Sequence, residues 1–226
     1  STYCGGTTVT GATLVVANTS GSGTGSGTVT AESGGVVGGR GTIGGALVLN
    51  GGSTVAPGIE TTLDSTCANA PGTLSVGGDV TFGGNATFAF HIDDALGCAG
   101  SAMDLLSISS SLLLNATECN PFQIDVYSLN ACDRPGALAN FNAGQSYSWV
   151  FASAGGSITG FDPYAFTVNT ANFQNSFTGT FGVAQSGSEL LLQYTPAAVP
   201  EPATWMLLLA GGAVLAIGAR RRKRAR

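Results

Sequence analysis

The sequence TIGGALVLNGGSTV, at residues 42–55, is the clearest indication of the fold of this chain. A second copy, SVGGDVTFGGNATF, follows at residues 75–88, and four of the aligned positions are identical. The apolar positions of the two copies correspond throughout, and they alternate with polar or small residues. This period of two predicts β-strands with one buried face. A shorter, weaker echo occupies residues 29–37, and the Gly- and Ser-rich residues 18–27 are expected to form a loop or linker.

The glycine pairs between these runs predict the corners of an all-β solenoid, similar in architecture to a parallel β-helix. Glycine supplies the positive φ that a tight corner needs, and stacked turns bury the inward side chains. We assign residues 1–92 to this solenoid. The inward positions are expected to be the pairs Leu47 with Val80 and Leu49 with Phe82. The outward positions between them are expected to be Val48 and Thr81.

From residue 93 the repeat loosens, but short apolar runs continue to residue 195. They predict further β-strands, which either close the solenoid or form a small β-sandwich cap. The aromatic residues from Tyr147 to Tyr194 are expected to form the core of this part, and a carbohydrate-stacking platform is the alternative. The runs are Leu105–Ile108, Leu112–Leu114, Phe122–Tyr127, Ser148–Phe151, Phe177–Val183 and Glu189–Tyr194.

A membrane-length apolar segment lies near the C-terminus. The linker at residues 196–202 contains Pro200-Glu201-Pro202 and precedes the uncharged run Ala203–Ala219. As a helix this run would span about 26 Å, which is short but workable for a bilayer core of about 30 Å. Six of the last seven residues, 220–226, are basic, and such a cluster stays cytoplasmic. We therefore expect a single transmembrane helix with the body of the chain on the far side, because a buried core helix would not end in six cations.

The order of these three parts resembles the PEP-CTERM sorting signal of Gram-negative bacteria. The resemblance implies that a membrane-embedded exosortase recognises Pro200, Glu201 and Pro202 and processes the chain. It also implies a precursor held transiently in the inner membrane and a product at the outer surface or in the extracellular polysaccharide matrix. A plain C-terminal anchor with a proline-rich hinge is the alternative.

A second resemblance concerns the body of the chain. The sequences GTIGG at residues 41–45 and GGSTVAPG at residues 51–58 resemble the autotransporter-associated β-strand repeat. That repeat belongs to parallel β-helical passengers of surface proteins. The resemblance implies a fold and a surface setting, and it implies no chemistry.

The charge of the chain is divided between its two parts. Residues 1–199 contain 12 of the 13 acidic residues and only two cations, Arg40 and Arg134, so their formal charge is −10. An acidic body of this kind is a poor binder of phosphates, which argues against nucleic acid as a partner. The chain starts at Ser1, and we expect a mature form or fragment whose export signal was encoded upstream.

The cysteine content indicates the redox compartment of the protein. The chain has five cysteines: Cys4, Cys67, Cys98, Cys119 and Cys132. None forms a Cys-x-x-Cys pair, and with a single histidine the sequence argues against a zinc site. In an oxidising compartment disulfides are the default, and we expect Cys67–Cys98 around the second repeat and Cys119–Cys132 around a strand and a loop. Each would stabilise the fold by about 3 kcal/mol. Cys4 is left over, with its partner expected upstream.

Catalysis has little support in the sequence. His91 is the only histidine, and its place after Phe88-Ala89-Phe90 predicts a polar residue at the end of a strand. Asp93, Asp94 and Asp104 are candidates for a calcium site or a pair of glycosidase carboxylates. The spacing Asp-x-Asp-x-Asp-Gly is absent, however, which favours solvated loop acids. No catalytic residue, metal or cofactor is predicted.

Together these features predict a non-enzymatic, exported surface or matrix protein with a structural or adhesive role. Its expected partners are an exosortase-type enzyme, the inner membrane and, as a further candidate, extracellular polysaccharide. The alternative is a polysaccharide-active β-helix enzyme, a lyase or hydrolase, because β-solenoids also host such activities. The two cations of the body weigh against a lyase, which must neutralise a uronate carboxylate.

Overall fold

The computed structural model describes residues 3–58 and 70–198, and these residues are built almost entirely of β-strands. The strands form three six-stranded sheets, here called A, B and C. Sheet A contains β1 (Thr7–Val9), β3 (Val29–Ala31), β6 (Leu47–Leu49), β9 (Val80–Phe82), β12 (Leu112–Leu114) and β15 (Ile158–Thr159). Sheet B contains β2 (Thr13–Val16), β4 (Val36–Gly39), β7 (Thr54–Pro57), β10 (Thr87–Ile92), β13 (Phe122–Ser128) and β16 (Phe166–Asn172). Sheet C contains β5 (Thr42–Ile43), β8 (Thr73–Val76), β11 (Leu105–Ile108), β14 (Tyr147–Ala154), β17 (Thr180–Ser186) and β18 (Glu189–Thr195).

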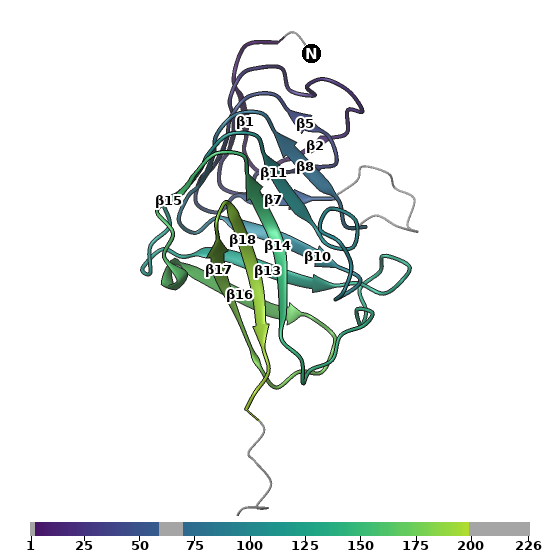
Figure 1. Ribbon diagram of the computed structural model, residues 1–226. Helices are drawn as coiled ribbons and strands as arrows, with labels where there is room; N and C mark the ends of the chain where they lie inside the picture. The colour runs from purple at the N-terminus through teal and green to yellow at the C-terminus, as the bar shows by residue number, and fades with distance from the viewer. Residues whose placement is uncertain (1–2, 59–69, 199–226) are drawn as a thin grey trace, which may run out of the picture. The chain divides into compact units, whose positions relative to one another are not determined.

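The chain visits the three sheets in a fixed order, so that β3, β4 and β5 form one turn and β6, β7 and β8 form the next. Every strand from β1 to β16 that pairs with its counterpart in the next turn does so in parallel. Figure 1 shows these turns stacked from the purple N-terminal strands to the green ones. The body is therefore β-helix-like, as the glycine-punctuated repeat predicts.

The sequence repeat coincides with the register of the strands. Leu47 pairs with Val80 and Leu49 with Phe82, and these are also the aligned positions of the two sequence copies. All four side chains are fully buried, whereas Val48 and Thr81 between them are partly exposed on the outer face. The predicted inward and outward positions of the repeat are confirmed.

The turns of the solenoid differ in length. Val29 of β3 pairs with Leu47 of β6, so the weak echo at residues 29–37 belongs to a full but short turn of its own. The following turn, from Leu47 to Val80, is longer because 15 residues separate Pro57 of β7 from Thr73 of β8. Residues 18–27 contain no strand, in agreement with the expected loop.

The corner between sheets A and B has the same backbone conformation in three successive turns. Gly34, Gly52 and Asn85 have φ angles of 72°, 79° and 59°. They are stacked, because the N–H of Gly34 donates to the carbonyl of Gly52, and the N–H of Gly52 donates to that of Asn85. Glycine and asparagine adopt this left-handed conformation at the lowest cost, which explains their place at the corner.

Residues 93–195 continue the solenoid and then close it. Strands β11 to β16 extend the three sheets, after which β18 pairs antiparallel with β14, and β17 pairs antiparallel with β18. Aromatic side chains fill the space beneath this hairpin, where Tyr194 is fully buried and lies 5.0 Å from Phe181 between ring centroids. The predicted core position is therefore confirmed for Tyr147, Trp149 and Tyr194, which are buried, but it is wrong for Tyr164, which lies on the surface.

The predicted transmembrane helix at residues 203–219 lies outside the described residues. Among residues 3–58 and 70–198, no helix has the length and apolar character needed to cross a bilayer. The only helical segment in this part of the chain is the short 3₁₀ turn η1 (Pro163–Ala165).

Candidate functional site

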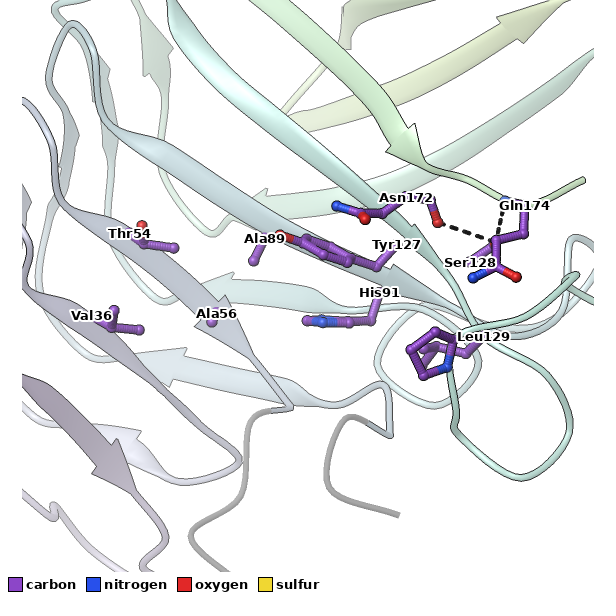
Figure 2. A pocket seen from close by; sticks show the side chains of 11 residues that line it. Val36, Thr54, Ala56, Ala89, His91, Tyr127, Ser128, Leu129, Asn172 and Gln174 are labelled. Carbon is purple, nitrogen blue, oxygen red and sulfur yellow. Dashed lines mark hydrogen bonds between the residues drawn. The ribbon is translucent and has the colours of Figure 1, made fainter. Parts of the chain in front are cut away.

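The outer face of sheet B carries a pocket of about 370 Å³. Its floor is formed by small apolar side chains of three adjacent strands, Val36 of β4, Ala56 of β7 and Ala89 of β10. His91 of β10 and Tyr127 of β13 lie beside this floor, as Figure 2 shows. The period of two along these strands places all five side chains on the outer face, while Phe88 and Phe90 of β10 point into the core.

His91 and Tyr127 form a ring pair along the sheet. The two residues are register partners on β10 and β13, and their rings stack with centroids 4.9 Å apart. Burial and the nearby negative charge of Asp125 raise the pKa of Tyr127, so its hydroxyl remains a hydrogen-bond donor at neutral pH. The pair therefore offers aromatic surface together with groups that form hydrogen bonds.

A buried carboxylate holds the His91 ring in place. Asp104 precedes β11 and is fully buried, and its Oδ2 lies 2.8 Å from Nδ1 of His91. The same carboxylate accepts the backbone N–H of His91 at 3.0 Å and that of Gly72 at 2.9 Å. Burial raises the pKa of Asp104 to about 6, while the hydrogen bond from the His91 side chain acts in the opposite direction.

This contact determines which ring nitrogen of His91 faces the pocket. An ionised Asp104 accepts a hydrogen bond from the protonated Nδ1, which leaves Nε2 as the available acceptor of a neutral imidazole. Thr54, Asn172 and Gln174 add hydroxyl and amide groups to the pocket lining. Among the described residues that line the pocket there is no Lys, Arg, Asp or Glu, so the lining combines an apolar floor with uncharged polar groups.

The three acids suggested by the sequence do not act as one group. Asp104 is not a solvated loop acid, as the sequence favoured, but a fully buried residue bonded to His91. Asp94 accepts hydrogen bonds from the backbone N–H of Leu96 and from the side-chain amide of Asn140, and these bonds lower the pKa of Asp94. Burial, followed by the charges of Asp133 and Asp94, raises the pKa of Asp93. In the described part of the chain, no three His, Cys, Asp or Glu residues gather as potential metal ligands.

The structure separates one of the two predicted cysteine pairs. Cys119 precedes β13 and Cys132 follows it, and both are exposed with free thiols. A seven-residue strand extends roughly 23 Å, whereas the two Cα atoms of a disulfide lie within about 7 Å of each other. The predicted Cys119–Cys132 bond is therefore not present in this arrangement. Cys67 lies outside the described residues, so Cys67–Cys98 stays a prediction.

A second functional segment lies beyond the described body. The proposed recognition residues Pro200, Glu201 and Pro202 fall outside the described residues, as do the apolar run and the basic end. Comparison with protein families identifies a PEP-CTERM protein-sorting motif at residues 198–223. No curated protein matches the chain.

The motif match has a direct functional meaning. A PEP-CTERM signal marks an exported protein whose precursor is anchored in the membrane and is processed by an exosortase, a membrane protease-like enzyme. The sequence resemblance at residues 199–226 is thereby confirmed, and the three-part order of motif, apolar run and basic end was the signal that revealed it. The His91–Asp104 pair, in contrast, was missed because the two residues lie on either side of a loop and share no linear motif.

Proposed function

We propose that this exported protein has a structural or adhesive role at the outer surface or in the extracellular polysaccharide matrix. The observation that carries the proposal is the combination of a sorting motif with a body made of stacked β-turns. Such a body buries one continuous core and leaves long outer faces for contacts with other molecules. Its function then lies in what these faces touch once the sorting signal has delivered the chain.

The charge of the body supports a role outside the cell. The body has 12 acids and two cations, so it repels anionic membranes and nucleic acids and stays soluble in a crowded matrix. The outer face of sheet B carries an uncharged polar row of Thr54, Thr87, Gln123 and Thr167, which are register partners on successive strands. Hydroxyl and amide groups in a regular row suit a hydrated, hydroxyl-rich polymer.

The producing organism offers the direct test. Three strains are compared: the wild type, a strain that lacks the chain, and a strain in which Pro200, Glu201 and Pro202 are replaced by alanine. We expect the wild-type chain in the matrix fraction, the triple variant retained with the cells, and reduced cohesion of the matrix in both altered strains. Unchanged cohesion without the chain would contradict the structural or adhesive role, whatever the location of the protein.

A polysaccharide-active enzyme is the second candidate, and the His91–Asp104 pair is the observation that favours it. A carboxylate that orients a histidine beside a pocket is one part of a general base arrangement. The described pocket lining has no cation to neutralise a uronate, and the Ser128 hydroxyl accepts the N–H of Gln174 instead of facing His91. Incubation with matrix polysaccharide should release no reducing ends and no unsaturated products, and release that is lost in His91→Ala would establish the enzyme.

A further inference from the structure

We propose that the pocket on sheet B is a binding site for an uncharged sugar ring, with His91 and Tyr127 as the residues that contact it. The inference rests on the proposed function, because it names the class of polymer that the matrix protein would hold. Three properties of the pocket support it: its shape, its hydrogen-bonding groups and the neutrality of its lining.

The shape of the pocket depends on a change in side-chain size across sheet B. Tyr127 covers one side of the His91 ring, while the residues on the neighbouring strands β7 and β4 are only Ala56 and Val36. The space left open beside the ring pair amounts to about 370 Å³, within the range of small-molecule pockets. A sugar ring has apolar C–H faces that pack against an aromatic edge or face and against alanine side chains. Figure 2 shows these small side chains next to the two rings.

The hydrogen-bonding groups surround this space from both sides. Asp104 is bonded to Nδ1 of His91, and Nε2 makes no hydrogen bond with the described part of the chain. Thr54 lies on β7, and Asn172 and Gln174 lie on and just after β16, across the ring pair. The threonine hydroxyl and the two amide groups can each donate and accept a hydrogen bond. Sugar hydroxyls, which also donate and accept, match such a lining.

The neutrality of the lining selects among sugars. No Lys or Arg is present among the described lining residues, and the body as a whole carries −10. A uronate or sulfated ring would have no cation to pair with, and it would approach a negative surface at a cost. A neutral sugar ring has no charged group whose hydration would be lost when the ring enters the pocket. The geometry therefore favours a neutral glycan over an acidic one.

The test uses the full chain purified in detergent and three hexasaccharide probes: cellohexaose, mannohexaose and a hexamer of galacturonic acid. Affinities are measured by titration calorimetry at neutral pH. We expect the wild type to bind at least one neutral hexamer and to bind the galacturonic hexamer far more weakly. Tyr127→Ala and His91→Ala should weaken that binding by about tenfold or more, as expected for loss of a ring contact.

Tyr164 supplies a matched control, because it is a tyrosine outside the pocket with 75% of its surface exposed. Tyr164→Ala should bind like the wild type, and Asn172→Ala should weaken binding without removing a core group. Thermal melts of each variant establish that it is folded. The proposal is overturned if the wild type binds neither neutral hexamer. It is also overturned if folded Tyr127→Ala and His91→Ala bind the hexamer as tightly as the wild type.

Combining the binding measurements with the matrix experiment distinguishes an error in the pocket assignment from an error in the proposed matrix role. If the chain holds the matrix together in the producing organism and folded Tyr127→Ala does so equally well, the pocket assignment is wrong and the proposed function stands. If the pocket binds a neutral hexamer but loss of the chain leaves matrix cohesion unchanged, the matrix role is wrong and the site stands.

Discussion

The carboxylate of Asp104 lies 2.8 Å from Nδ1 of His91, and it joins a loop that precedes a strand of sheet C to a strand of sheet B. Because the same carboxylate also accepts two backbone N–H groups, it fixes the corner between the two sheets as well as the histidine ring. The pocket on sheet B therefore depends on a residue that does not line it. A buried acid with such a role has measurable consequences for stability.

The first prediction concerns the pH dependence of folding. The pKa of Asp104 rises from 3.8 to about 6 on folding, so the folded state binds more protons than the unfolded state between these values. The free energy of unfolding should therefore fall as pH rises from about 4 to about 6, by roughly 3 kcal/mol from this group. Asp104→Asn removes the titration, and urea unfolding across this range should give a flatter profile than the wild type.

Asp94→Asn is the control for this experiment. Asp94 has a lowered pKa, so its contribution to stability has the opposite sign and increases with pH. Its removal should not flatten the decline attributed to Asp104. Identical pH profiles for the wild type and Asp104→Asn would show that ionisation of Asp104 does not limit stability.

The second prediction tests the inward and outward positions of the repeat. Leu47→Asp places a charge without a partner in the solenoid core and should destabilise the fold by several kcal/mol. Val48→Asp places the same charge on the outer face and should cost under about 1 kcal/mol. Thermal melts of the two variants provide the comparison. Equal tolerance of both changes would mean that the register of β6 and β9 is wrong.

The third prediction concerns the corner between sheets A and B. Gly52→Ala forces a φ of 79° on a residue with a Cβ, and that Cβ would lie 2.8 Å from the Ser33 hydroxyl oxygen. We expect a loss of about 1–2 kcal/mol, measured by urea unfolding. Asn85→Gly at the equivalent position of the next turn should be tolerated, because glycine adopts the same φ freely. A greater loss for Asn85→Gly would contradict this account of the corner.

The fourth prediction concerns processing at the C-terminus. The surface form should lack the apolar run and the basic residues 220–226, because the sorting motif is a substrate for processing. Intact-mass analysis of protein released from the surface would reveal the missing segment. A surface form that retains Arg220–Arg226 would identify a plain membrane anchor.

The fifth prediction concerns the cysteines. Non-reducing peptide mapping of the native protein should link Cys67 to Cys98, as the sequence predicts. It should find no bond between Cys119 and Cys132, because β13 keeps them apart. Protein from the native compartment with all five thiols free would argue against an oxidising location.

Features that depend on local periodicity and on linear motifs can be predicted from the order of the amino acids alone. The alternation around Leu47 and Phe82 identified the strands, and the alignment of the two copies matched their register, because a residue's face in a strand follows from its position along the chain. The sorting motif was likewise visible because an enzyme recognises it as a linear segment.

Contacts between residues of different turns depend on the packing of the whole fold. Residues 93–172 have the pattern of a loosened repeat, yet they continue the same sheets, because backbone groups make the hydrogen bonds between parallel strands and the side chains need not repeat. The burial of Asp104 against His91 depends on how the intervening loop closes, and the separation of Cys119 from Cys132 depends on the extension of β13. Such non-local contacts arise from the packing of whole turns, and no short sequence pattern encodes them.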